Sequence, residues 1–357
     1  MSSIEQLHKV GQSIWIDNIT RDLLDDGTIG RYIAEWGVTG LTSNPSIFEK
    51  AVAKSSAYDA ALGASVANGA SVEAAFFEAA IDDLRRAADL FQPIFEATNG
   101  IDGWVSLEVS PLLADNVEDT IAAAVALFAQ AQRSNLYIKI PGTPAGLRAI
   151  EEAIAAGVPV NVTLLFSTQQ YVEAAKAYYR GIERRITEGL DPAVHSVASL
   201  FISRWDVAVN DQVPADLHNV LGIAIGATSY AAFQELINSD WVSGLIAQGA
   251  PVQRLLFAST GMKDPHARDT LYVEALAARD TVNTMPDNTL AAFVDHGEIE
   301  VGLSPHQSEA AETLARIAEH VDLPALAERL LQDGKRSFIA SWESLLTTVS
   351  TKVDAQS

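Results

Sequence analysis

A lysine lies in the middle of an apolar stretch that runs from Leu136 to Thr143, with the sequence Leu-Tyr-Ile-Lys-Ile-Pro-Gly-Thr. If this stretch is a β-strand, its period of two places Tyr137 and Lys139 on one face and the aliphatic side chains on the other. A buried ammonium without a partner is costly, so such a group pairs with a carboxylate or loses its proton. A neutral amine is a nucleophile toward carbonyl groups. The pattern indicates a nucleophilic Lys139, and the alternative is an exposed lysine on an edge strand.

Polar side chains recur on one face of other strand-like stretches. Alternation sends Asp17 to one face of the first stretch, Glu108 to the inner face of the third, and Asn161 and Thr163 to one face of the fifth. A lysine for imine formation and two carboxylates for proton transfer are what Schiff-base carbon–carbon bond chemistry requires. The predicted cluster comprises Asp17, Asn44, Glu108, Lys139, Asn161 and Thr163.

Each member of this cluster also has a structural interpretation. Asp17 could cap the helix that follows it, and Asn44, which precedes Pro45, could be a turn or N-cap residue. Thr163 could be an ordinary β-branched strand residue. None of the seven histidines stands in a His-x-His or His-Glu-x-x-His pattern, so no metal site is predicted.

The elements that must position these residues alternate between strand-like and helix-like stretches, without a low-complexity linker. In a chain of 357 residues this alternation predicts one α/β domain over residues 1–357, a (β/α)₈ TIM barrel with additional helices. The strands are expected at Ser13–Asp17, Val38–Ser43, Gly103–Val109, Leu136–Ile140, Pro159–Phe166, Ser196–Ser203, Arg254–Ser259 and Thr281–Met285. Active sites of this architecture lie at the carboxyl ends of the strands.

Additional helices are expected in two places. An alanine-rich helical insertion covers about residues 55–97, with a break at Asn68-Gly69, and the chain closes with helices over about 308–348. The alternative to the barrel is a doubly wound open sheet. Its dinucleotide-binding form is disfavoured, because no Gly-x-Gly-x-x-Gly follows the first strand.

Charge and composition narrow the function classes. Forty-six acidic and 24 basic side chains give a formal net charge of −22, which disfavours binding to nucleic acid or to anionic membranes. A solvated acidic shell explains most of this charge, and an anionic substrate needs a local basic pocket. The absence of cysteine excludes disulfides and thiolate chemistry. Because the N-terminus lacks the pattern of a secretory signal and no long apolar run stands out, a cytoplasmic protein is expected.

The motifs resemble the transaldolases, class I Schiff-base enzymes of the pentose phosphate pathway, over nearly the whole chain. The segments that carry the resemblance are 41–48 (LTSNPSIF), 105–109 (VSLEV), 137–141 (YIKIP) and 161–167 (NVTLLFS). Segments 258–263 (ASTGMK) and 281–286 (TVNTMP) are similar to a longer bacterial branch of actinobacterial type. The resemblance implies transfer of a dihydroxyacetone unit from a ketose phosphate to an aldose phosphate.

The resemblance also implies roles for the clustered residues. Lys139 would form the imine with the C2 ketone, and Glu108 would shuttle protons through a water that Thr163 also holds. Asp17 would take the proton of the C4 hydroxyl as the C3–C4 bond breaks. Asn44 and Asn161 would hold hydroxyls of the dihydroxyacetone unit. The protonated imine is the electron sink in such enzymes, so no metal or organic cofactor is expected.

A phosphate site is expected near the ends of strands six and seven. Arg204 is the expected phosphate ligand, although it directly follows Ser203 here, where many relatives separate the serine from the arginine by several residues. Ser259 and Lys263 follow strand seven, where barrels of this kind grip phosphate. The alternative for these two is a turn with a solvated lysine.

Two other function classes remain open. One is a lyase similar to fructose-6-phosphate aldolase, which releases free dihydroxyacetone; those relatives typically carry glutamine at the position of Glu108. The other is a catalytically silent barrel that binds sugar phosphates. Sugar phosphates are thus the expected partners, with no nucleic acid and no membrane, and both a monomer and a homodimer remain open.

Overall fold

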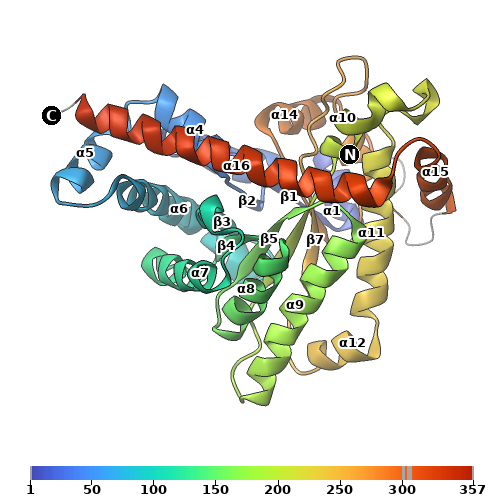
Figure 1. The fold of residues 1–357 in the computed structure, drawn as a ribbon, viewed down its shortest axis with the longest axis horizontal. Coiled ribbons are helices and arrows are strands. Elements are labelled where there is room, and N and C mark those ends of the chain that lie inside the picture. The colour runs from blue at the N-terminus through green and yellow to red at the C-terminus, as the bar shows by residue number, and fades with distance from the viewer. Residues whose placement is uncertain (1, 300–301, 304–307, 356–357) are drawn as a thin grey trace.

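The computed structural model describes residues 2–299, 302–303 and 308–355. Its centre is an eight-stranded parallel sheet in the order β2-β1-β8-β7-β6-β5-β4-β3, curled into a nearly closed barrel (Figure 1). Two backbone hydrogen bonds of 2.9 Å bridge the seam, from Leu41 to Trp104 and from Gly103 to Thr39. The predicted (β/α)₈ barrel is therefore confirmed. The strands are β1 Gln12–Ile16, β2 Gly40–Leu41, β3 Val105–Glu108, β4 Leu136–Pro141, β5 Val160–Leu165, β6 Ser196–Phe201, β7 Arg254–Ala258 and β8 Thr281–Met285.

Helices surround the barrel and cover the carboxyl ends of its strands (Figure 1). The predicted insertion consists of α5 and α6, and Gly69 separates them with a positive φ of 93°. The longer helices are α1 Ser3–Val10, α3 Thr28–Trp36, α4 Pro45–Lys54, α5 Asp59–Ala67, α6 Val72–Ala97, α7 Val117–Ala131, α8 Pro144–Ala155, α9 Thr168–Thr187, α11 Leu221–Ile237, α14 Asp287–His296, α15 Ser308–Ala318 and α16 Leu323–Asp354. Shorter helices are α2 Arg21–Asp25, α10 Ser203–Val209, α12 Asp240–Ile246 and α13 Leu271–Ala275.

Strand β2 is shorter than the predicted Val38–Ser43. A Cβ added to Gly40 would lie 2.7 Å from the carbonyl oxygen of Trp104 and from the indole of Trp15, so only glycine permits this approach. Beyond the two ends of this short strand, the backbone N–H groups of Thr39 and Thr42 still donate to the carbonyl oxygens of Ile14 at 2.8 Å and Ile16 at 2.9 Å, and α4 begins at Pro45.

Strand β5 contains a bulge at the level of the active site. Val162 pairs with Ala198 and Leu165 with Leu200, so one more residue lies on β5 than on β6 over this interval. Leu164 has a φ of 59°, a strained conformation for a branched residue. The predicted alternation therefore holds for Asn161 and Thr163 but does not continue through Leu164.

The last helix, α16, lies across the carboxyl ends of the strands (Figure 1). It packs along α4 and contacts α5, α6 and β5. Ion pairs fix it on two sides, from Lys335 to Asp115 at 2.8 Å and from Lys352 to Asp59 at 2.6 Å. Its Gly334 lies against Leu164, because a Cβ there would be 3.0 Å from the Leu164 side chain. The strained bulge of β5 is thus covered by α16.

One described stretch, Ala215–Ile237, has the length and apolar composition of a membrane-spanning helix. Half of its most apolar window is buried, and its helical part, α11, packs against α9 and α15. A core helix has these properties as well, so the stretch is weak evidence for a membrane.

Candidate active site

A cavity of about 350 Å³ opens at the carboxyl ends of the strands. Lys139 of β4 lies at its floor, and side chains from the loops after β1, β2, β6, β7 and β8 form its walls. The predicted residues that line it are Asp17, Asn44, Lys139, Thr163, Arg204, Ser259 and Lys263. The remaining predicted residues, Glu108, Asn161 and Ser203, lie directly behind this lining.

Lys139 is buried, with a residue exposure of only 4%. Its Nζ donates a hydrogen bond of 3.0 Å to the carbonyl oxygen of Ser43 and lies 3.6 Å from Oε2 of Glu108. The alternative of an exposed lysine on an edge strand is therefore wrong. An amine held by one carbonyl and one carboxylate, with a free path into a cavity, is placed to attack a bound carbonyl carbon.

Glu108 of β3 is the carboxylate nearest to this amine. The register explains the contact, because β3 and β4 pair with Glu108 directly beside Lys139. Burial raises the pKa of Glu108 to about 7, although the neighbouring lysine opposes the shift. Oε2 accepts no hydrogen bond from the described residues. A carboxyl group that titrates near neutrality can both donate and accept a proton.

Asp17 follows β1 and lines the same cavity as Lys139. Its Oδ1 accepts a hydrogen bond of 2.7 Å from the hydroxyl of Thr42, which also contacts the hydroxyl of Thr284 at 2.7 Å. Burial raises the pKa of Asp17, while Lys139 and the bond from Thr42 lower it. The capping interpretation of Asp17 is wrong, since the N-cap of α2 is Thr20.

Asn161 is fully buried one strand away from the lysine. Its Oδ1 accepts a bond of 2.7 Å from the hydroxyl of Ser199, and its Nδ2 donates to Ser106 at 3.2 Å. Thr163, two residues further along β5, is also fully buried. Its hydroxyl has no hydrogen-bond partner among the described residues, which is costly unless a bound molecule supplies one.

Asn44 has the predicted structural role as well as a place in the cavity. It is the N-cap of α4, where its Oδ1 accepts a bond of 3.1 Å from the backbone N–H of Ile47. The cap fixes the amide group, so its two N–H donors remain to face the cavity. The two interpretations of this residue are therefore compatible.

The basic side of the cavity is formed by the loops after β6 and β7. Arg204 lies over the ring of Phe201, with its Cζ 5.9 Å from the ring centroid, and burial lowers its pKa. Ser259 has a φ of 56°, and its hydroxyl contacts that of Ser203 at 2.9 Å. Ser203 is therefore a support behind Ser259. Lys263 is exposed at the rim.

Several lining residues were not predicted. Thr42, Ser46 and Ser199 lie within or beside the stretches already considered, and the alternation of β6 could have indicated Ser199. Phe338 of α16 has no such signal, because it comes from a helix far along the chain. Lys50 of α4 also reaches the rim. These residues enter the site through packing of helices over the barrel.

The chain was also compared with known protein families and with individual proteins. The family model described as Transaldolase/Fructose-6-phosphate aldolase matches residues 14–349. The transaldolase of Mycolicibacterium smegmatis is 41% identical over 365 residues, covering 99% of this chain and 98% of the relative. The transaldolases of Thiobacillus denitrificans and Thermobifida fusca are each 42% identical, with coverage of 98% and 99% of this chain and of 100% and 99% of their own lengths.

Proposed function

This chain belongs to the transaldolase/fructose-6-phosphate aldolase family and is a transaldolase, and we propose that Lys139 is its Schiff-base lysine. The observation that carries the proposal is a lysine with 4% exposure at the floor of the cavity, flanked by Glu108 and facing Asp17. The substrates proposed are sedoheptulose 7-phosphate or fructose 6-phosphate as donor and glyceraldehyde 3-phosphate or erythrose 4-phosphate as acceptor. We place this metabolism in the cytoplasm.

In the first half of the reaction, Nζ of Lys139 attacks C2 of the ketose and forms a carbinolamine. Loss of water from the carbinolamine needs a proton donor, and Glu108 supplies that proton through a water held together with Thr163. The pKa of Glu108 near 7 supports this role, as do Oε2 of Glu108 and the hydroxyl of Thr163, which form no hydrogen bond with the described residues.

In the second half, Asp17 takes the proton of the C4 hydroxyl. The C3–C4 bond breaks, its electron pair moves into the iminium group, and the aldose phosphate leaves. The bound enamine then adds to the carbonyl of an incoming aldose phosphate, and hydrolysis of the new imine releases the product. Asn44 and Asn161 hold the hydroxyls of the three-carbon unit, and Arg204, Ser259 and Lys263 bind the phosphate.

Reductive trapping tests these assignments. Borohydride with fructose 6-phosphate should attach a dihydroxyacetone-derived group to Lys139, as located by peptide mass mapping, and inactivate the protein. Lys139→Ala should stay folded and give no adduct. An adduct on another lysine contradicts the proposal. In Asp17→Asn the trapped group should be the whole sugar phosphate, because cleavage is slowed by about 10² or more.

The description of the family also names fructose-6-phosphate aldolase, which is a lyase. Glu108 favours transfer, since the lyase relatives typically carry glutamine there. A coupled assay distinguishes the two: a transaldolase needs an aldose phosphate acceptor for turnover, whereas a lyase releases dihydroxyacetone without one.

A further inference from the structure

A second cavity, of about 590 Å³, lies at the amino ends of the strands, at the opposite end of the barrel from the proposed active site. Much of its wall is apolar, formed by side chains such as Ile101, Ile237 and Val252. Ile101 is 60% exposed, which is unusual for a large apolar side chain. The volume of this cavity and its mixture of apolar and polar lining residues are typical of a small-molecule binding site.

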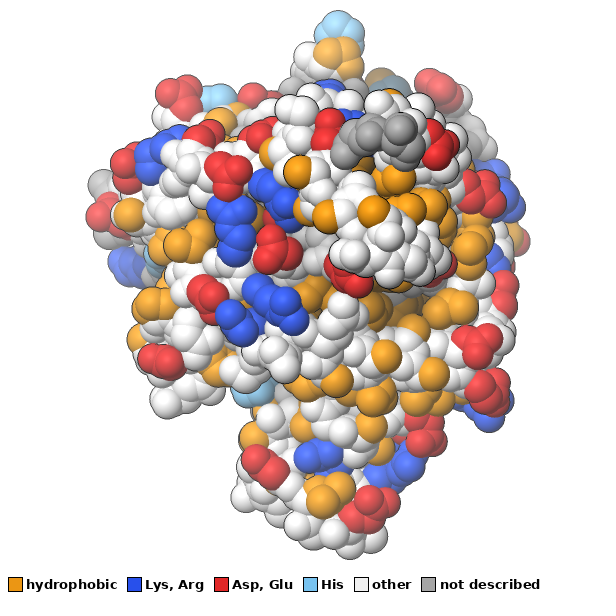
Figure 2. Space-filling model, turned by 90° about the vertical axis from the view of Figure 1, so that its left-hand side faces the viewer, with side chains coloured by type: hydrophobic (Ala, Val, Ile, Leu, Met, Phe, Trp, Pro, Cys, Tyr) orange, Lys and Arg blue, Asp and Glu red, His pale blue; other side chains and the backbone are white. Residues whose placement is uncertain are grey.

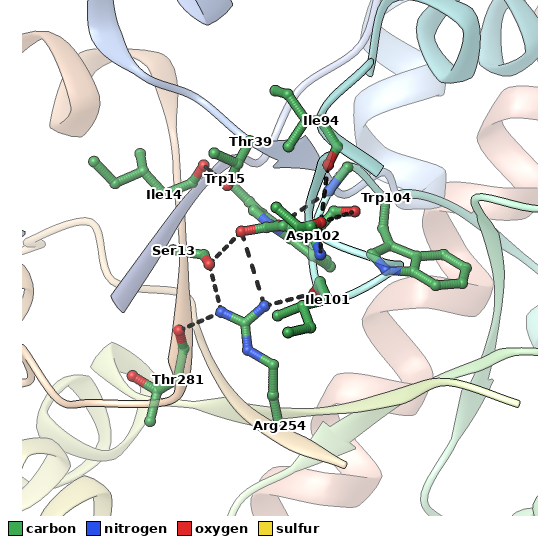
Figure 3. A network of polar contacts seen from close by, with 12 residues as sticks. Ser13, Ile14, Trp15, Thr39, Ile94, Ile101, Asp102, Trp104, Arg254 and Thr281 are labelled. Carbon is green, nitrogen blue, oxygen red and sulfur yellow. Dashed lines mark hydrogen bonds and ion pairs between the residues drawn. The ribbon is translucent and has the colours of Figure 1, made fainter. Parts of the chain in front are cut away.

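The floor of this cavity is a buried polar network (Figure 3). Arg254 of β7 is 8% exposed, and its two terminal nitrogens donate to the carbonyl oxygens of Ile101 at 2.9 Å and Thr281 at 2.8 Å, and to the hydroxyl of Ser13. Asp102 lies 3.8 Å away and accepts a bond of 2.7 Å from the Trp15 indole. The network fixes the guanidinium in one orientation at the cavity floor.

Three donor groups in the cavity wall have no partner within the described ranges. The hydroxyl of Tyr137, whose residue exposure is 2%, forms no hydrogen bond with any described residue. The same holds for the imidazole of His195 and for Nε of Arg254, and all three side chains line the cavity. Tyr137 and His195 both contact the ring of Trp104, at centroid distances of 4.0 and 5.3 Å.

The charges nearest to these donors favour an anion, while the carboxylate of Asp280, which also lines the cavity, pairs with Arg279 at 3.4 Å. Burial raises the pKa of Tyr137, and Arg254 lowers it more than Asp102 raises it. Burial and the field of Arg254 lower the pKa of His195 to about 4, so its ring is neutral at pH 7 and offers one N–H donor. At both side chains, therefore, the positive charge of Arg254 is not cancelled by its neighbouring carboxylate.

We propose that this cavity binds a small monocarboxylate with a compact apolar body, whose carboxylate is held by Tyr137, His195 and Arg254 and whose body lies against Ile101. A carboxylate accepts several hydrogen bonds at once, which matches the unpartnered donors. The single positive charge, already shared with Asp102, suits one negative charge better than a phosphate dianion. The site is separate from the cavity at Lys139 and does not depend on the transaldolase activity.

Benzoate is a suitable probe, and benzamide is its neutral isostere. Titration of the full-length protein, followed by calorimetry and by tryptophan fluorescence, should show saturable binding of benzoate and much weaker binding of benzamide. Tyr137→Phe removes only the hydroxyl and should weaken benzoate about tenfold or more, as expected for a hydrogen bond to a charged group. Tyr171→Phe, which removes a buried hydroxyl outside the cavity, should bind benzoate normally.

A substitution at an exposed residue allows binding to be tested without an effect on folding. Ile101→Asp places a negative charge at the rim of the cavity and should weaken the binding of benzoate. Ile101→Asn, which adds no charge, should weaken this binding less. Arg204→Ala, at the other end of the barrel, should leave the affinity unchanged. The proposal is overturned if the wild-type protein shows no saturable binding, if Tyr137→Phe and Ile101→Asp bind benzoate as the wild type does, or if Arg204→Ala abolishes binding.

Discussion

At the scale of single residues, the proposed site contains buried carboxyl groups whose ionised forms are unfavourable. Glu108 is buried 3.6 Å from Lys139 through an oxygen that accepts no hydrogen bond from the described residues, and the carboxylate of Asp17 accepts one hydrogen bond from the hydroxyl of Thr42. Burial raises the pKa of both carboxyl groups. Groups arranged in this way destabilise the folded protein when ionised, but they give acids and bases that work near neutral pH.

Replacing Glu108 should therefore reveal a pH-dependent stability. Between its usual pKa of 4.5 and the folded value of about 7, the folded state holds a proton that the unfolded state has lost. Raising the pH through this range costs the wild type stability, at most about 3 kcal/mol, and the cost is constant above it. In urea unfolding at pH 5, 6, 7 and 8, the free energy of unfolding of Glu108→Gln should increase relative to that of the wild type as the pH rises. The exposed control Glu118→Gln should show no such gain, and a gain that shrinks with pH would contradict the prediction.

At the scale of elements, the barrel brings the reacting groups together and α16 covers them. Phe338 is 4% exposed and lines the cavity, while Ser341, one turn later, contacts Ser46 of α4 at 2.9 Å. An aromatic wall above an imine or enamine limits access of water, and exclusion of water protects such intermediates from hydrolysis. We expect α16 to favour transfer over release of dihydroxyacetone.

Phe338→Ala tests this expectation. Opening the wall should raise the ratio of dihydroxyacetone release to transfer severalfold, measured in parallel coupled assays with and without acceptor. Leu345→Ala is the matched control, because Leu345 is a fully buried residue of the same helix that does not line the cavity. Both changes should cost about 2–5 kcal/mol of stability. If the two variants show the same ratio, the effect comes from loosening of α16 and not from the aromatic wall.

At the scale of the whole molecule, a net charge of −22 opposes the binding of sugar phosphates. Carboxylates are scattered among basic side chains over the face in Figure 2, consistent with a solvated acidic shell. Charges separated by more than about 10 Å are largely screened at 0.1 M salt, so cations at the cavity act on the substrate more than the distant carboxylates do. The positions of charged side chains at the cavity should therefore affect the binding of sugar phosphates more than the net charge of the protein does.

Two lysine variants with the same net charge separate these effects. Lys263→Ala removes a cation at the rim of the cavity, and Lys9→Ala removes an exposed one on α1, which precedes the amino end of β1. At 0.1 M salt, Lys263→Ala should raise KM for the donor severalfold with little change in kcat, and Lys9→Ala should change neither. Arg204→Ala should raise KM by roughly tenfold or more. Equal effects of the two lysine variants would show that net charge dominates.

The sequence by itself determined the order of the elements and the inward face of most strands. Burial on both faces of a parallel strand makes a mid-strand Lys139, Glu108 or Asn161 conspicuous, and a period of two assigns its direction. The barrel was predicted in this way and is confirmed, with most strands close to their predicted bounds and β2 shorter. Family membership was predicted from the resemblance of the motifs and is also confirmed. The domain assignment and the catalytic roles stay predictions.

Only the tertiary structure decided which side chains meet and what each one contacts. Register put Glu108 beside Lys139, and packing of α16 brought Phe338 over the cavity. The bulge at Leu164 and the short β2 depend on contacts with Gly334 and Trp104 that no local pattern encodes. The unpartnered donors at Tyr137 of β4, at His195 just before β6 and at Arg254 of β7 also come from separate parts of the chain. Local periodicity fixes the face of a residue, whereas the burial and neighbours that set its charge state arise when distant segments pack together.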